Sequence, residues 1–212
     1  MWLDLLLLVF LLFALLELFI ITSAFFGFVR TRVPFIRTNP DDIKLLLAVL
    51  PLSASDVFVD LGSGNGSVTL AVARGSAAAT IGYELARWTH YWAQLQKLLG
   101  GYHRSVFHRR NFFRADWGEA TVIYAYLYPS LMERVEEKFR RDCRAGTLLV
   151  ARDFPLPHLQ PERIVATGGQ RYSLVNGPVR TKRQRFWSLL LSFLPSKKSL
   201  RHEFYIYRLV DK

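Results

Sequence analysis

Residues 57–73 read VFVDLGSGNGSVTLAVA: a short apolar run with one acid, three alternating glycines, then a second apolar run. The first run has the length and β-branched content of a buried strand, whereas the second has helical spacing. Glycine tolerates positive φ angles and lets another molecule approach the backbone closely. The stretch therefore predicts a strand, a tight turn and a helix, with the turn at the carboxyl edge of a parallel sheet.

The rest of the chain continues this alternation. Asn39 precedes a proline and two acids, the signature of a helix amino terminus. A chain of 212 residues with 51% hydrophobic content suffices for one buried domain and a small appendage. We therefore expect an α/β, Rossmann-like, mostly parallel sheet covered on both faces. The expected strands are 56–61, 80–84, 105–108, 121–127, 147–151, 164–166 and 203–209, and the expected helices between them are 67–74, 86–99 and 130–142.

The amino terminus carries a different signal. Residues 5–29 are a predominantly apolar run with one charge, Glu17, and as a helix they would exceed the roughly 30 Å of a bilayer core. A cleaved signal peptide is disfavoured because no basic residue precedes the run, which is also too long. Three arginines follow it, which places the rest of the chain on the cytoplasmic side, or on the equivalent matrix side. We expect residues 1–30 to be a single-pass transmembrane anchor and residues 31–212 to be the catalytic domain.

The net charge of +11 indicates a negatively charged partner. Residues 178–201 hold seven basic residues and no acid around the apolar segment FWSLLLSFL. We interpret this segment as an insertion before the last strand that lies on an anionic lipid surface, although a helix packed over a sheet edge fits equally well. A further basic run, at residues 104–114, is either a solvated face or a contact for an acidic target. No metal site is expected, because His103 and His108 lack accompanying ligands and Cys143 is the only cysteine.

The glycine spacing selects the type of ligand. A dinucleotide fingerprint is G-x-G-x-x-G, whereas this turn is G-x-G-x-G with Ser67 where the third glycine would stand. A nucleoside that bears a carboxylate and an ammonium fits better, with Asp60 near the ammonium. Glu84 follows eighteen residues after Gly66, close to the offset at which an acid reaches ribose hydroxyls. S-adenosylmethionine has all of these groups.

Five segments in order resemble one family: VPFIRTNPDD (33–42), FVDLGSGNG (58–66), GYE (82–84), NFFRADW (111–117) and ARDFPLPHLQP (151–161). Together they resemble the small class I S-adenosylmethionine-dependent lysine methyltransferases, which include the enzymes acting on the adenine nucleotide translocase and the ATP synthase c subunit, and their prokaryotic relatives. This resemblance implies a seven-strand sheet with an antiparallel last strand. It also implies that S-adenosylmethionine is bound by Thr38, Asp60, Gly62, Ser63, Gly64, Asn65, Gly66, Glu84, Asn111 and Phe112.

The resemblance further implies that Asp116 and the segment Tyr126–Pro129 present the substrate amine. Methyl transfer needs an uncharged amine in line with the sulfonium, and tyrosines can accept its hydrogen bonds and attract a methylated ammonium. Tyr126, Tyr128 and Asp116 are thus the expected catalytic residues. The expected partner is a protein that presents a lysine, including a membrane protein; nucleic acid is disfavoured. Two alternatives remain open: an RNA methyltransferase with the same fold, and a noncatalytic membrane-tethered binding module.

Overall fold

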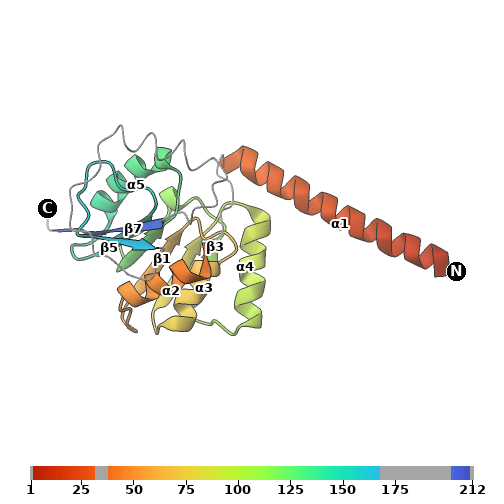
Figure 1. The fold of residues 1–212 in the computed structure, drawn as a ribbon, viewed down its shortest axis with the longest axis horizontal. Coiled ribbons are helices and arrows are strands. Elements are labelled where there is room, and N and C mark those ends of the chain that lie inside the picture. The colour runs from red at the N-terminus through yellow and green to blue at the C-terminus, as the bar shows by residue number, and fades with distance from the viewer. Residues whose placement is uncertain (1, 32–37, 168–201, 211–212) are drawn as a thin grey trace.

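The computed structural model describes residues 2–31, 38–167 and 202–210, and Figure 1 shows a domain from which one long helix extends. The predicted insertion at 178–201 lies outside the described residues. The helices are α1 (Trp2–Thr31), α2 (Pro40–Val49), α3 (Ser67–Gly75), α4 (Arg87–Leu99), the short 3₁₀ helix η1 (Phe112–Arg114) and α5 (Pro129–Asp142). The strands are β1 (Val57–Leu61), β2 (Ala79–Tyr83), β3 (Ser105–His108), β4 (Val122–Ala125), β5 (Leu148–Arg152), β6 (Arg163–Thr167) and β7 (His202–Arg208).

The strands form one seven-stranded sheet in the order β3-β2-β1-β4-β5-β7-β6. Neighbouring strands from β3 to β5 are parallel, whereas β7 is antiparallel to both β5 and β6. The predicted α/β class and the antiparallel last strand are therefore confirmed. Because β1 and β4 are adjacent although β2 and β3 lie between them in sequence, the chain reverses direction across the sheet at β1, where ligands bind in such folds.

Helices cover both faces of the sheet (Figure 1). On one face, Ile123 of β4 packs in a buried cluster with Val135 and Phe139 of α5. On the other face, the next residue of the strand, Tyr124, packs in a cluster with Leu46 of α2. This alternation of side chains along a doubly covered strand explains why the strand is apolar throughout.

The start of α2 follows the predicted capping. The side chain of Asn39 accepts a hydrogen bond from the Asp41 amide at 3.2 Å, and Pro40 occupies the first turn. The helix ends at Val49, two residues before Pro51, which cannot continue a helix. Leu45 and Leu46 of this helix pack on one face of the sheet, and Asp42 in its first turn is a buried carboxylate.

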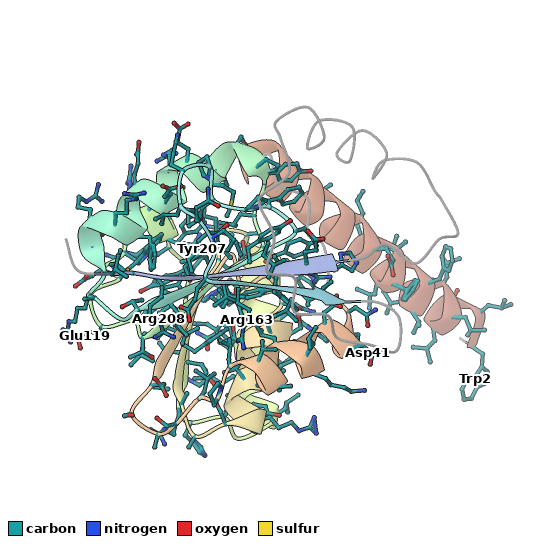
Figure 2. All side chains as sticks on the ribbon, turned by 60° about the vertical axis from the view of Figure 1, so that its left-hand side comes forward. Trp2, Asp41, Glu119, Arg163, Tyr207 and Arg208 are labelled. Carbon is teal, nitrogen blue, oxygen red and sulfur yellow. The ribbon has the colours of Figure 1, made fainter. Side chains whose placement is uncertain are left out.

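Helix α1 runs away from the domain, with Trp2 at its far end (Figures 1 and 2). Its described large apolar side chains, from Leu3 to Leu18, are all more than half exposed. Within the part of the chain whose side chains the structure describes, no helix is both long enough and apolar enough to span a membrane. The transmembrane anchor therefore stays a prediction.

Candidate functional site

The glycine turn joins β1 to α3 and has left-handed backbone at all three glycines. The φ angles are 85° at Gly62, 54° at Gly64 and 80° at Gly66. The amides of Gly62 and Ser63 both donate to the Tyr83 carbonyl at 2.9 Å, which fastens the turn to the end of β2. The Gly66 amide donates to the Ser63 carbonyl at 2.8 Å. The turn is thus held by its own backbone at the carboxyl edge of the sheet.

Neighbouring elements press closely on this turn. A Cβ atom at Gly66 would lie 2.8 Å from the Phe107 ring and 3.0 Å from the Ala93 side chain. A Cβ atom at Gly82 would lie 2.8 Å from the Cβ atom of Ser63. Glycine is therefore required at Gly66 for two reasons, its positive φ and the contact with β3 and α4.

Glu84 connects the turn to the following helix. One oxygen of its carboxylate accepts a hydrogen bond from the Gly64 amide at 2.9 Å, and the other accepts one from the Ala86 amide at 2.7 Å. Burial raises the pKa of this carboxyl, and the backbone donors oppose that shift. The structure thus brings together Glu84 and the glycine turn, as the sequence predicted, and leaves further carboxylate lone pairs for a ligand's hydroxyl groups.

Asp60 lies under the turn at the end of β1. Its carboxylate accepts a hydrogen bond from the Thr69 hydroxyl at 2.7 Å, and the residue is buried. Burial raises the pKa of Asp60 to about 7, assisted by the nearby charge of Glu84 and opposed by the Thr69 hydroxyl. Asp60 therefore ties the first turn of α3 to the strand. Its predicted contact with a ligand's ammonium stays a prediction.

Asn65 and Ser63, the two polar side chains between the glycines of the turn, differ in their hydrogen bonding. The side chain of Asn65 accepts from the Ser67 amide at 3.2 Å, and its carbonyl accepts from Gln96 of α4 at 2.8 Å. By contrast, the buried hydroxyl of Ser63 has no hydrogen-bond partner among the described residues. A buried hydroxyl without a partner is costly, so a polar group of a ligand would satisfy it. This observation supports a small-molecule site over the turn.

Asn111 and Phe112 follow the end of β3 in the same row of loops. The side chain of Asn111 caps η1 by accepting from the Phe113 amide at 2.9 Å. Phe112 is buried, and its carbonyl accepts from the Trp117 indole at 3.1 Å. This loop is therefore rigid, and Asn111 is held at the edge where a base could bind.

A second polar group lies beyond the ends of β4 and β5. The guanidinium carbon of Arg152 lies 4.4 Å from the centre of the Tyr126 ring, and Arg152 also forms a buried ion pair with Asp42 of α2. Tyr128 is the residue before the first turn of α5, and Thr38 is buried just before α2. The predicted acceptor residue Tyr126 is thus fixed by a cation that is itself paired.

Sequence reasoning missed Asp153, which lies close enough to Tyr126 to raise the pKa of its hydroxyl, and the groups that Asp153 contacts. Asp153 has a φ angle of 62°, which is rare for a residue other than glycine. Its carboxylate lies 3.0 Å from Nδ1 of His202 and accepts from the Glu203 amide at 3.2 Å. Tyr205 in turn donates to the Glu203 carboxylate. The sequence signal for this group was the pair Arg152-Asp153 at the end of a buried strand. The carboxyl ends of parallel strands meet at one edge of the sheet, so charged residues there lie near the site.

Asp116 is not brought to this group. Its side chain is exposed and accepts from the Gly118 amide at 2.8 Å, next to the backbone of Asp142 at the end of α5. Figure 2 shows the neighbouring Glu119 and the α2 residue Asp41 at opposite ends of the sheet. The catalytic roles predicted for Asp116, Tyr126 and Tyr128 all stay predictions.

The chain is similar in sequence to known lysine methyltransferases. Residues 60–163 match the family model described as the ANTKMT methyltransferase domain. The chain is 29% identical over 143 residues to the adenine nucleotide translocase lysine N-methyltransferase of Mus musculus, covering 67% of this chain and 62% of the relative. It is 25% identical over 140 residues to the ATP synthase c-subunit lysine N-methyltransferase of Homo sapiens, and the match covers 66% of this chain and 59% of that relative. A protein-lysine N-methyltransferase of Saccharolobus islandicus is 26% identical over 137 residues, covering 63% and 84%.

The matched region thus spans about three fifths of the length of the two animal relatives. Among solved structures, an RNA methyltransferase from Salinibacter ruber in complex with S-adenosyl-L-homocysteine has a TM-score of 0.63 and 22% identity, covering 84% of this chain and 95% of that one. An O-methyltransferase from Thermotoga maritima has a TM-score of 0.59 and 14% identity, covering 84% and 68%. These two structures bear on the fold alone. The family matches confirm the resemblance that the sequence motifs predicted.

Proposed function

We propose that this chain is an S-adenosylmethionine-dependent protein-lysine N-methyltransferase, because its residues 60–163 match the family model described as the ANTKMT methyltransferase domain. The observation that carries the proposal is the linkage of Glu84 to the glycine turn, 2.9 Å from the Gly64 amide. A nucleoside with an amino-acid tail needs an acid for its ribose beside a glycine turn that it can approach closely, and both stand here at one edge of the sheet.

The chain's own residues then have separate tasks. Glu84 would hold the ribose, the backbone from Gly62 to Gly66 would hold the amino-acid part with the Ser63 hydroxyl, and Asn111 would hold the base. When bound, the cofactor supplies a methyl group activated by its sulfonium. The protein contributes position, because the acceptor nitrogen must approach in line with the bond that breaks.

The acceptor amine is proposed to lie beside Tyr126. Burial and the neighbouring Asp153 raise the pKa of Tyr126 to about 12, so its hydroxyl stays uncharged at physiological pH. An uncharged phenol can accept a hydrogen bond from a neutral amine, while the carboxylates of Asp153 and Glu203 offer negative charge for the amine's ammonium form. Tyr128, at the adjacent start of α5, is the second proposed contact of the amine.

We further propose that the enzyme works at a membrane. In sequence, the apolar run continues through 5–29, including residues whose side chains are not described, and the described ones are exposed. The two animal relatives are named for their targets, the adenine nucleotide translocase and the c subunit of ATP synthase. The proposal is a single-pass protein with its catalytic domain on the cytoplasmic or equivalent matrix side, a lysine of a membrane protein as substrate, and segment 178–201 against anionic lipid.

The test is transfer of a radiolabelled methyl group from S-adenosylmethionine to separated membrane, soluble-protein and RNA fractions, with Glu84→Ala as the inactive control. Label on lysine in the membrane fraction is expected. Label confined to RNA would reject the lysine proposal in favour of the RNA methyltransferase. Absence of cofactor binding by calorimetry would reject both enzymes and favour a noncatalytic binding module. Label confined to soluble protein would reject the membrane substrate alone.

A further inference from the structure

Helix α4 presents an apolar stripe to the outside of the domain. The stripe consists of residues spaced by three or four, so they lie on one side of the helix. Leu98 and Leu99, near its end, are 77% and 78% exposed, far more than leucines that support a fold. The full stripe is Trp88, Tyr91, Trp92, Leu95, Leu98 and Leu99, which we call the α4 stripe.

The opposite side of the helix holds α4 on the domain. Ala93 is fully buried and packs in a cluster with Leu70 of α3 and Phe107 of β3, and His90 is also buried. The α4 stripe is therefore not needed for this packing. Exposed apolar surface of this extent, with two tryptophan rings stacked 6.3 Å apart at Trp88 and Trp92, marks a contact surface.

The surroundings of the α4 stripe are basic. Residues 85–115, which form α4, the edge strand β3 and the adjoining loops, contain six lysines and arginines and no aspartate or glutamate. Arg87 begins the helix and Lys97 lies in its last turn. Burial lowers the pKa of the His90 imidazole. Arg109, which follows β3, lies near enough to lower it further, by a smaller effect. The α4 stripe thus belongs to a part of the chain that carries only positive charge.

The position of α4 relative to α1 selects a bilayer as the occupant. The two helices are in contact, and Figure 1 shows α4 standing across the direction of α1, along the side of the domain toward which α1 extends. If α1 enters a bilayer, α4 faces the surface of the same bilayer and lies along it. Tryptophan and tyrosine favour the headgroup level of a membrane, leucine favours the acyl chains, and basic residues favour anionic lipid.

We propose that the α4 stripe inserts into the interface of an anionic bilayer as a second membrane contact, beside the anchor. This inference rests on the membrane attachment proposed for α1. Two contacts would fix the orientation of the domain, with the carboxyl edge of the sheet held close to the membrane surface. Single-stranded RNA is the competing occupant, since aromatic and basic residues also bind it; the two exposed leucines favour lipid, because they offer RNA neither a stacking ring nor a hydrogen bond.

The test uses the full chain in lipid nanodiscs of mixed neutral and anionic phospholipid, with and without brominated acyl chains that quench tryptophan. Trp2→Phe and Trp187→Phe leave Trp88 and Trp92 with Trp117, which is fully buried and serves as the unquenched reference. We expect the bromolipid to remove most of the emission of the two α4 tryptophans. Further substitution Trp88→Phe/Trp92→Phe should abolish the bromine-dependent loss.

Leu98→Glu/Leu99→Glu should restore most of the emission, whereas Val210→Glu, a control residue that is 74% exposed, should leave the quenching unchanged. Calorimetric binding of S-adenosylhomocysteine checks that each variant is folded. Emission unaffected by bromolipid would overturn the proposal, and so would equal effects of the leucine variant and its control. Protection of α4 from hydrogen exchange by single-stranded RNA but not by nanodiscs would also overturn it. None of these results depends on methyl transfer, so this proposal and the proposed function can fail separately.

Discussion

The carboxylate of Glu84 and the backbone amide of Gly64 lie 2.9 Å apart, twenty residues from each other in sequence. Since the same carboxylate also accepts from the Ala86 amide, it joins the glycine turn to the start of α4. A charged group held by two backbone donors keeps its place when a ligand arrives. The position proposed for the ribose would thereby be formed before binding, which reduces the cost of binding.

Removal of this carboxylate should weaken cofactor binding. We expect Glu84→Ala to lower the affinity for S-adenosylhomocysteine at least about tenfold, because a hydrogen bond to a charged group contributes about 1.5–3 kcal/mol. Isothermal titration calorimetry measures the change. Glu119→Ala is the matched control, since that side chain is 78% exposed and pairs only with Arg144 at the surface. Equal affinities for both variants would show that the ribose assignment is wrong.

The glycine turn allows close contact and backbone strain to be separated. Gly66 and Gly146 have φ angles of 80° and 85°, but only at Gly66 would a Cβ atom meet neighbours, at 2.8 Å. Both alanine variants bear the strain of a left-handed residue, whereas Gly66→Ala also crowds Phe107. We expect the unfolding free energy of Gly66→Ala to be lower than that of Gly146→Ala by about 1–3 kcal/mol. Urea unfolding of the two variants in the same detergent measures the difference, and equal midpoints would contradict the crowding argument.

Adjacent aspartates in α2 should differ sharply in their contribution to stability. Asp42 forms a buried ion pair with Arg152, whereas Asp41 pairs with Lys44 at the surface, where its side chain is 81% exposed. Asp42→Ala leaves the buried Arg152 with only the more distant Asp153 carboxylate, at 3.8 Å, and should cost about 3 kcal/mol. Asp41→Ala should cost less than about 1 kcal/mol. Both substitutions remove one acid from the first helical turn, so their difference in unfolding free energy reports the burial. Similar losses would exclude a structural role for the Asp42 pair.

Much of the fold could be predicted because its signals are local. The cap at Asn39, the glycine turn after β1 and the apolar strands each declare themselves within a few residues, and the observed strand ends differ from the expected ones by two residues or fewer. Glu84 was found because its distance from the turn is set by one βα unit. Such features depend on backbone geometry, which short sequences specify.

The acceptor side could not be predicted in the same way. Arg152 contacts Asp42, 110 residues earlier, and Asp153 contacts His202, 49 residues later. No local pattern specifies such pairs, because they depend on which strands become neighbours. The loop that carries Asp116 is a further case: its exposed side chain accepts from the Gly118 amide, and the role that its motif predicts stays a prediction.

The stability of the domain should depend on pH through Asp60. Its pKa is about 7 in the folded protein and near 3.8 when unfolded, so the folded state retains a proton that the unfolded chain releases. The stabilisation is fully present below about pH 4 and is lost as pH rises through 7. The Asp60→Asn variant cannot ionise at this position. Between pH 5 and 7.5, the unfolding free energy of the unsubstituted protein should therefore fall by about 2 kcal/mol relative to that of the variant. Unfolding free energies of both proteins at each pH measure this, and titrating groups that do not interact with Asp60 cancel in the comparison. A gap that stays constant with pH would contradict the raised pKa.

The hydroxyl of Tyr126 should matter for catalysis but not for cofactor binding. Tyr126→Phe keeps the ring on which Arg152 stacks and removes only the group proposed to accept the amine's hydrogen bond. We expect kcat for methylation to fall about tenfold or more, with unchanged affinity for S-adenosylhomocysteine. Because the pKa of Tyr126 is about 12, the hydroxyl does not ionise between pH 7 and 9. As pH rises, the acceptor amine loses its proton and the rate should increase. The pH dependence should be the same for both proteins, with a lower maximal rate for Tyr126→Phe.

Tyr91→Phe, on the exposed side of α4, is the control and should retain full activity. A Tyr126→Phe enzyme with native kcat would place the acceptor elsewhere, and a changed pH profile would mean that the tyrosine takes up the proton itself.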